Sequence, residues 1–301
     1  MNNFDCIIVG AGPAGLSSCL TLGRARRKVA LFDDGTNRNR VTHESHGFIT
    51  RDGIKPQEFK EIGLNEVKKY PSVSYFNHTI TEIIKPKVDH RFIAKTVDGQ
   101  SFFFEKIILA TGVQEVFPIQ SVRNYYGKSL FSCPYCDGWE LQDKPLIVLA
   151  EKEEQALHMA KVVYNWSKDL VVLTNGNELS SDGVKELTKR NITVKMEPIK
   201  NLIGDDGYLQ QIELESGEMI LRSGGFVVPS FYRPNQFVEK LGCEIQENGV
   251  VVTDGTGRTT QKNIYIAGET EKSGPTSLII AAADGNKAAI SVNSDLILER
   301  F

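Results

Sequence analysis

Two cysteines, Cys133 and Cys136, stand two residues apart in the run Cys-Pro-Tyr-Cys-Asp, and this spacing suits disulfide chemistry. Such a pair can close a short, reducible ring, and a first thiol near a helix N-terminus ionises easily and becomes a nucleophile. A structural zinc site would need a second ligand pair, yet the short-spaced histidines, His43 and His46, lie far upstream. We therefore expect a redox disulfide and no metal.

A glycine-rich run near the N-terminus, Gly10-Ala11-Gly12-Pro13-Ala14-Gly15, follows a predicted buried strand at residues 4–9 and opens a helical pattern over residues 16–24. A strand, a glycine turn and a helix in this order are typical of dinucleotide binding. The first glycine permits the tight turn, the second lets the backbone approach a pyrophosphate, and the third allows close helix packing. The phosphates would then lie at the helix N-terminus.

Charged residues follow the second predicted strand, residues 28–32, where the ribose of a dinucleotide would lie. Asp33 and Asp34 end this strand, and the register favours Asp33 as the acceptor for the ribose hydroxyls. Arg38 and Arg40 come next in the chain. An arginine at this place can neutralise the adenosine phosphates, although an exposed loop pair explains both residues nearly as well.

Two further segments, each a strand that runs into a turn of small residues, indicate FAD in preference to NAD. Residues 106–112 end in Ala110-Thr111-Gly112, and residues 263–269 end in Gly268-Glu269 near the C-terminus. Together with the first glycine run, these segments would surround one dinucleotide.

These motifs occur in an order that resembles the low-molecular-weight thioredoxin reductase family, from residue 4 to about residue 296. Within it, the chain is most similar to the branch that includes the dithiol oxidases of disulfide natural products. The resemblance implies an α/β fold with two doubly wound nucleotide-binding-type domains, the second inserted in the first. We place the FAD-binding domain at residues 1–114 and 242–301, and the inserted redox domain at residues 115–241. The likeness to the branch rests on residues 34–41, 46–53 and 136–140.

The resemblance implies different roles for the two sulfurs. Cys136 would face the flavin and exchange electrons with it, while Cys133 would react with the external sulfur partner. Asp137 is the candidate acid or base for the leaving thiolate; otherwise it is a helix acid that only complements the dipole. Tyr135 and Trp139 would shield the sulfurs and the flavin from water, a position that core packing explains almost as well.

Four further residues enter the FAD site through the resemblance. Backbone N–H groups of Ser277 and Leu278, at the start of a helix, would face the pyrimidine edge of the flavin. Glu269 stands where the family usually has Asp; its longer side chain would still reach the ribityl or pyrophosphate end, unless it is only a solvated glutamate of the turn. His46 lies in a loop that the family folds near the flavin, where it would hold a proton unless it is a hydrogen-bonded loop residue.

The inserted domain lacks both halves of the usual NADPH site. After the strand at residues 145–149 the family has a glycine-rich turn, but this chain continues as Ala150-Glu151-Lys152-Glu153-Glu154. Acids in a first helical turn suit the helix dipole and repel a phosphate in the same place. The strand at residues 170–173 leads into Thr174-Asn175-Gly176-Asn177-Glu178, without the basic residues that hold the 2′-phosphate. We expect this domain to keep its fold without binding NADPH.

Composition favours a cytoplasmic enzyme. The 301 residues suffice for two domains, and a net charge of −3 gives no sign of a nucleic acid or membrane partner. No apolar run approaches the roughly 18 residues of a membrane span, and the N-terminus leads into a strand without a signal peptide. The 5 cysteines, an odd number, do not make a secreted disulfide scaffold. The resemblance adds the expectation of a homodimer.

Three functions compete, and the first accounts for every departure from the family. It is an FAD-dependent thiol/disulfide oxidoreductase that exchanges electrons between the flavin and the Cys133-Cys136 pair without NADPH. Its partner would be a redox protein such as ferredoxin, flavodoxin or a thioredoxin-like protein, or a small dithiol or disulfide. The second is a dithiol oxidase that closes a disulfide in a small molecule and passes the electrons to oxygen. The third is a flavin-containing redox sensor or binding protein.

Overall fold

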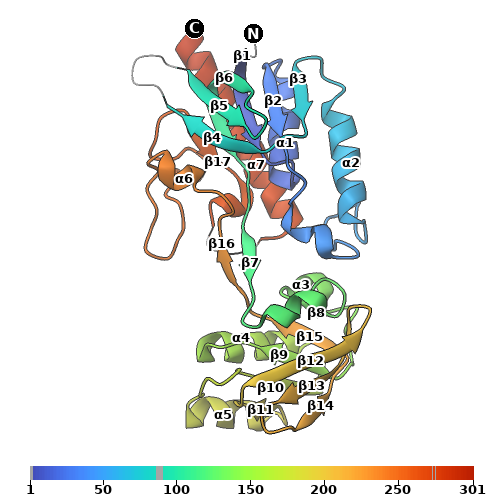
Figure 1. The fold of residues 1–301 in the computed structure, drawn as a ribbon. Coiled ribbons are helices and arrows are strands. Elements are labelled where there is room, and N and C mark those ends of the chain that lie inside the picture. The colour runs from blue at the N-terminus through green and yellow to red at the C-terminus, as the bar shows by residue number, and fades with distance from the viewer. Residues whose placement is uncertain (1–2, 86–90, 273, 275) are drawn as a thin grey trace. The chain divides into compact units, whose positions relative to one another are not determined.

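The computed structural model describes residues 3–85, 91–272, 274 and 276–301 and divides the chain into two compact units (Figure 1). The first unit comprises Met1–Arg40, Phe48–Gln114 and Phe231–Phe301, and the second comprises Val41–Gly47 and Glu115–Ser230. Each unit has its own parallel sheet with helices packed on it. The predicted α/β class and the two doubly wound folds are therefore confirmed.

A mostly parallel sheet lies at the centre of the first unit. Its strands are β1 (Asn3–Val9), β2 (Val29–Phe32), β3 (Val73–Phe76), β4 (Ile80–Ile84), β5 (Phe92–Thr96), β6 (Ser101–Leu109) and β17 (Ile264–Ile266). They follow the order β3-β2-β1-β6-β5-β4, and β17 also pairs with β6. The last four residues of β1, 6–9, and all of β2 are apolar and buried on both faces, as a covered parallel sheet requires.

Helices α1 (Pro13–Arg24) and α7 (Leu278–Arg300) cover one face of this sheet (Figure 1). Alternate residues of β1 point to this face, where Cys6 and Ile8 pack among apolar side chains of both helices. Ile7 and Val9 point to the opposite face and join a cluster that is rich in phenylalanine. Other helical segments of the unit are α2 (Pro56–Val67), α6 (Phe237–Lys240), and the short 3-10 helices η1 (Arg38–Val41) and η3 (Gly268–Thr270).

The contact between α1 and α7 is close enough to require a glycine. A Cβ atom on Gly285 would lie 2.0 Å from the carbonyl oxygen of Ala14, so the two backbones meet almost directly. The hydroxyl of Ser18 lies 2.9 Å from the Ala14 carbonyl and 2.8 Å from the Gly285 carbonyl, and it bridges the two helices. This contact sets the position of the first turns of both helices.

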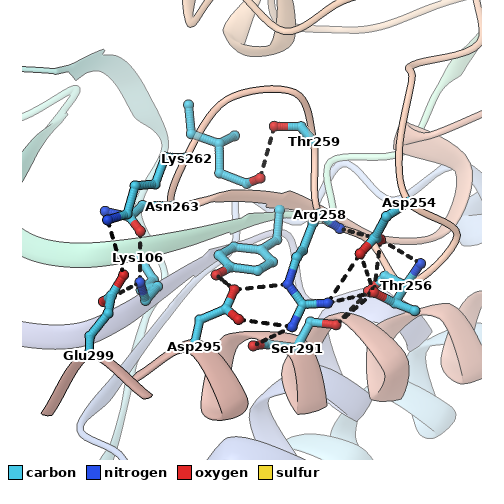
Figure 2. A network of polar contacts seen from close by, with 12 residues as sticks. Lys106, Asp254, Thr256, Arg258, Thr259, Lys262, Asn263, Ser291, Asp295 and Glu299 are labelled. Carbon is cyan, nitrogen blue, oxygen red and sulfur yellow. Dashed lines mark hydrogen bonds and ion pairs between the residues drawn. The ribbon is translucent and has the colours of Figure 1, made fainter. Parts of the chain in front are cut away.

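Polar contacts fix the other end of α7 (Figure 2). The Asp295 carboxylate receives two hydrogen bonds of 2.9 Å from the Arg258 guanidinium and another from the hydroxyl of Tyr265. Burial opposes ionisation there, yet these hydrogen bonds hold the pKa of Asp295 below its usual value. Nearby, the buried ammonium of Lys106 in β6 lies 2.6 Å from Glu299 of α7. These residues tie the helix to the sheet; we call them the α7 network.

The second unit contains a parallel sheet with the order β11-β10-β9-β15-β8. Its strands are β8 (Leu130–Phe131), β9 (Leu146–Leu149), β10 (Leu170–Leu173), β11 (Thr193–Lys195) and β15 (Gly224–Val227). Helices α4 (Glu153–Val163) and α5 (Ser181–Thr188) cover one face. The antiparallel strands β12 (Ile199–Asp205), β13 (Tyr208–Leu214) and β14 (Met219–Leu221) cover the other. The remaining helical segments are η2 (Gln120–Asn124) and α3 (Pro134–Asp137).

The chain passes between the units through β7 (Gln114–Val116) and β16 (Ser230–Tyr232), which pair with each other. The predicted domain boundary lay at residues 241 and 242, whereas the second unit ends at Ser230. The difference arises because the apolar side chains of α6 pack into the core of the first unit. Val41–Gly47, which we predicted to belong to the first domain, is part of the second unit. None of the helices in the described part of the chain is long and apolar enough to cross a membrane.

We expect the substitution Gly285→Ala to destabilise the protein by about 1–3 kcal/mol, because the added methyl group meets the Ala14 backbone, which no rotamer change relieves. Helix propensity alone predicts the opposite sign, a gain of about 0.5–1 kcal/mol. Urea unfolding measures the difference. Lys287→Ala, on the exposed side of the same helix, is the control and should stay within about 0.5 kcal/mol of the parent. A stabilised Gly285→Ala protein would contradict the close contact.

Candidate functional site

A cavity of the first unit lies at the carboxyl ends of β1, β2 and β6. From β1 the sheet continues to β2 and β3 on one side and to β6 on the other, so the strand order reverses here. Such a switch point is the usual place for a ligand in an open α/β sheet. The cavity is lined by many of the residues predicted from the sequence. These are Gly10, Gly12, Pro13, Ala14, Asp33, Asp34, Ala110, Thr111, Gly112, Glu269 and Leu278.

The N-terminus of α1 faces this cavity without a capping group. Gly12 is the N-cap residue, no side chain caps the helix, and its first turn contains no acid. A Cβ atom on Gly12 would meet nothing within 4 Å, so the backbone is open on the cavity side. Unpaired N–H groups and the positive end of the helix dipole together suit a pyrophosphate.

Close contacts at the predicted glycines shape the cavity, and of these glycines Gly15 and Gly268 lie outside its lining. Gly10 has a φ of +104°, and a Cβ atom there would lie 2.3 Å from the Ala110 carbonyl oxygen. A Cβ atom on Gly15 would lie 1.8 Å from the carbonyl oxygen of Gly10, and one on Gly268 would lie 2.9 Å from the Cβ of Ala14. Ser277 is the N-cap residue of α7, next to the lining residue Leu278. The absence of side chains at Gly10 and Gly268 thus lets the turn after β1 lie directly against the turns that contain Ala110 and Gly268.

Asp33 is the acid that the register favoured, and its carboxylate is buried at the end of β2. One oxygen accepts a hydrogen bond of 2.9 Å from the Ala11 amide, and the other accepts one from Gly35 and pairs with the Lys60 ammonium. A carboxylate has about four acceptor positions, so one remains for a ribose hydroxyl. Asp34 is exposed and binds Thr36 of its own turn instead.

Glu269 lines the cavity, but its carboxylate is paired with an arginine. Arg38 donates two hydrogen bonds to it, of 3.2 Å from Nε and 2.8 Å from Nη2, and the Thr276 amide donates a third of 2.9 Å. The side chains of Arg38 and Glu269 are 20% and 13% exposed. That Glu269 contacts the ribityl or pyrophosphate end of FAD therefore stays a prediction. The ion pair also places the guanidinium of Arg38 in the lining of the cavity.

Besides Gly15, Gly268 and Ser277, two further residues assigned to the cofactor from the sequence lie outside the cavity lining. Arg40 is exposed, and its guanidinium donates to the carbonyl oxygens of Thr36 and Asn37. His46 belongs to the second unit, where its Nε2 lies 3.7 Å from Glu44 and 3.6 Å from Glu140. The sequence did not distinguish Arg38 from Arg40 as the arginine near the adenosine phosphates, and the structure places Arg38 in the cavity lining.

Thr270 is a buried residue of the site that the sequence reasoning missed. Its hydroxyl oxygen accepts a hydrogen bond of 2.9 Å from the Gly112 amide and lies 3.5 Å from the hydroxyl of Thr111. The bond joins the turn after β6 to η3, which carries Glu269. Its position directly after the Gly268-Glu269 motif was the available signal.

In the second unit, Cys133 and Cys136 form a disulfide, with Cα atoms 5.3 Å apart. Cys133 is the N-cap residue of α3, and its carbonyl oxygen accepts hydrogen bonds from the amides of Cys136 and Asp137. Both cysteines are partly exposed. Tyr135 is 80% exposed and Trp139 is 69% exposed, so neither is a core residue of this unit. The pair can therefore open and close by thiol exchange at the surface of its unit.

The N-terminus of α4 differs from that of α1 in charge. Glu153 accepts hydrogen bonds from the amide of Ser180 at 2.9 Å and from its hydroxyl at 2.5 Å, and these bonds lower the pKa of Glu153. Glu151 accepts a hydrogen bond of 3.0 Å from Asn175. Carboxylates thus occupy the helix end where a pyrophosphate would bind. Among the described residues, no group of three or more His, Cys, Asp or Glu side chains is placed to hold a metal ion.

Comparisons with known proteins find similar chains over nearly the whole length of this one. A family described as pyridine nucleotide-disulphide oxidoreductase matches residues 4–285. The crystal structure of a putative thioredoxin reductase, TrxB, from Bacillus anthracis has a TM-score of 0.96 and 61% identity, covering 99% of this chain and 100% of that one. The crystal structure of HlmI has a TM-score of 0.91 and 32% identity over 99% of this chain and 93% of that one. A probable thioredoxin reductase from Arthroderma benhamiae is 27% identical over 99% of this chain and 82% of its own length.

We expect FAD affinity to depend on Arg38 but not on the charge of its partner Glu269. Arg38→Ala leaves the Glu269 carboxylate without its cation beside an anionic pyrophosphate, and we expect FAD affinity to fall about 10- to 100-fold. Glu269→Gln leaves the cation in place, and affinity should not fall. Fluorescence titration of the apoprotein with FAD measures both.

Arg40→Ala is the matched control, since it removes a guanidinium of the same loop that lies outside the cavity. Its FAD affinity should stay within about threefold of the parent. If Arg40→Ala weakened binding as much as Arg38→Ala, the assignment of Arg38 to the site would be wrong.

Proposed function

This chain belongs to the pyridine nucleotide-disulphide oxidoreductase family, and on this premise we propose that it is an FAD-dependent thiol/disulfide oxidoreductase that works without NADPH. As a member of the family it is a thioredoxin reductase-like oxidoreductase, and its cofactor is FAD. The proposal concerns the finer points: the exchange of electrons between the flavin and the Cys133-Cys136 disulfide, and the independence from NADPH.

The cavity of the first unit fits FAD. The bare N-terminus of α1 suits the pyrophosphate, and Asp33 retains an acceptor position for the ribose. Leu278 and the first turn of α7 line the cavity as well. Bound there, FAD supplies two-electron redox chemistry.

The chemistry of the second unit rests on its disulfide. Reduction adds two electrons and two protons and gives the thiols of Cys133 and Cys136. In our proposal the Cys133 thiolate attacks the disulfide of a partner, forms a mixed disulfide and expels one partner thiolate. Cys136 then attacks Cys133, which restores the internal disulfide and releases the second partner thiol. Asp137, next to Cys136 in the chain, is the proposed proton donor and acceptor for these thiolates.

The observation that carries NADPH independence is the binding of the α4 acids to their own unit. Glu153 is bound to Ser180, the N-cap residue of α5, and Glu151 is bound to Asn175 in the loop after β10. In that loop, Asn177 donates a hydrogen bond of 2.8 Å to the carbonyl of Thr174. The groups that would receive the pyrophosphate and the 2′-phosphate are thus replaced by acids and by a loop bonded to itself.

The electron partner follows from this loss. Without NADPH, the electrons must come from or go to another redox protein, such as a ferredoxin, a flavodoxin or a thioredoxin-like protein, or a small dithiol or disulfide. The relatives from Bacillus anthracis and Arthroderma benhamiae bear the name thioredoxin reductase, which favours a thioredoxin-like partner on the disulfide side. The homodimer and the cytoplasmic location stay predictions.

We expect NADPH and NADH at millimolar concentration not to reduce the flavin at a useful rate. Losing the phosphate contacts and adding like charges costs several kcal/mol, at about 1.4 kcal/mol for each tenfold in affinity. Anaerobic stopped-flow measurement of the oxidised-flavin absorbance tests this. Dithionite is the control, since it shows that the bound flavin can be reduced. Reduction by NADPH at tens per second would return the protein to the ordinary thioredoxin reductases. Rapid oxidation of the reduced protein by oxygen would instead support a dithiol oxidase.

The two cysteines should respond differently to substitution. Cys136→Ser should keep FAD but lose electron transfer between the flavin and the disulfide. Cys133→Ser leaves Cys136 as a free thiolate, which should give a long-wavelength charge-transfer band with oxidised flavin. Absorbance spectra and anaerobic titration with dithiols distinguish the two variants. Identical behaviour of both would disprove the assigned roles.

A further inference from the structure

A buried carboxylate in the second unit plays no part in the cavity or in the disulfide chemistry described above. Glu115, in β7, is 7% exposed, and it accepts a hydrogen bond of 3.1 Å from the hydroxyl of Tyr126. The same hydroxyl lies 2.7 Å from Oγ of Ser132. Ser132 directly precedes Cys133, so a chain of hydrogen bonds leads from a buried acid to the residue before the disulfide.

The direction of these hydrogen bonds follows from the number of donors. Tyr126 has one O–H, and it donates to the Glu115 carboxylate. The oxygen of Tyr126 must therefore accept the bond from the hydroxyl of Ser132. The Ser132 side chain is thus held in one orientation.

The ring of Tyr126 is itself fixed in place. It packs against the ring of Phe117 with centroids 4.6 Å apart. The Arg123 guanidinium lies over the Phe117 ring, 5.3 Å from its centroid. Arg123 also donates to the backbone carbonyl of Glu115 at 3.3 Å. The hydroxyl of Tyr126 therefore acts as a fixed point to which Ser132 is bound.

The segment that carries the disulfide contains little regular secondary structure, although the ring of Tyr135 packs against that of Trp166 with centroids 5.6 Å apart. The helix α3 spans Pro134–Asp137, has no side-chain cap, and is far shorter than the ~12 residues that an isolated helix needs to be stable. The strand β8 before it has two residues. While the disulfide is closed, its own ring restrains Cys133 and Cys136. When it is open, the bond from Ser132 to Tyr126 remains.

We propose that Glu115, Tyr126 and Ser132 are positioning residues that keep Cys133 close to Cys136 in the reduced protein. The inference rests on the proposed function in that it takes this pair as the redox couple. Holding the backbone before Cys133 raises the effective concentration of one thiol toward the other, as linking two groups does in general. A higher effective concentration favours the disulfide over the dithiol. Loss of the hydrogen-bond chain therefore makes the disulfide easier to reduce.

The test measures the equilibrium between the Cys133-Cys136 disulfide and its dithiol in the full FAD-bound protein. Mixtures of reduced and oxidised dithiothreitol set the potential, and mass spectrometry of the alkylated protein counts the thiols. Dithiothreitol gives two electrons and two protons to the protein disulfide and closes its own ring. The other cysteines, Cys6, Cys19 and Cys243, are buried and do not enter the count.

Tyr126→Phe and Ser132→Ala each break the chain while changing few atoms. We expect the equilibrium constant for disulfide formation to fall about tenfold in either, a shift of about 30 mV to higher potential. Ser132→Thr keeps the hydroxyl and should restore most of the parent value. Tyr125→Phe is the matched control, because Tyr125 is a neighbouring buried tyrosine whose hydroxyl donates to the Leu202 carbonyl and has no link to Ser132.

An unchanged potential in Tyr126→Phe or in Ser132→Ala would overturn the proposal, as would an equal shift in Tyr125→Phe. If Tyr126→Phe does not fold, Ser132→Ala carries the same test at a partly exposed position. The readout needs no electron transfer to the flavin. If the proposed function were wrong, electron transfer to or from the flavin would survive Cys136→Ser, while Tyr126→Phe and Ser132→Ala would still shift the reduction potential of the disulfide. A failure of the proposed function can therefore be told from a failure of this inference.

Discussion

The close approach of α1 and α7 determines the geometry of the first unit. Their backbones meet at Ala14 and Gly285, and the Ser18 hydroxyl bridges two carbonyl groups across the contact. Because both helices begin at the cavity, the position of one first turn fixes the other. The α7 network holds the opposite end of the same helix through ion pairs, of which only Lys106 is a fully buried member. A displacement of α7 along its axis would thus disturb the dinucleotide cavity and the network together.

Two helix N-termini that occupy equivalent places in the two units have opposite electrostatic character. At α1 the cap is a glycine, the first turn holds no acid, and an arginine lies across the cavity in a pair with Glu269. At α4 the first turn holds Glu153 and Glu154, and Glu153 is tied to Ser180. The helix dipole favours an anion at both places. In the first unit that anion can be a ligand, whereas in the second it is supplied by the protein itself.

Sequence reasoning succeeded where a short segment contains the whole signal. The glycine run, the acid after β2 and the paired cysteines can each be recognised from a few consecutive residues, even though Asp33 and Gly10 also contact residues far along the chain. It failed where function depends on contacts between distant residues. Arg38 is identified by its pairing with Glu269, 231 residues later, and nothing local separates it from Arg40. The placement of Val41–Gly47 in the second unit likewise depends on Gly127, where a Cβ atom would lie 2.4 Å from the Val41 carbonyl oxygen.

The division of the chain into discontinuous units also orders its folding during synthesis. Domains fold as units while the ribosome delivers the chain, and contacts between distant segments form slowly. All of the second unit, including Val41–Gly47, has been made once Ser230 has been added. The first unit still lacks β17 and α7 at that point, and the Ser18 contact spans 267 residues. The cavity is therefore completed by α7, which is synthesised after the whole second unit, so a chain that ends before α7 can carry a folded redox unit but no place for the flavin.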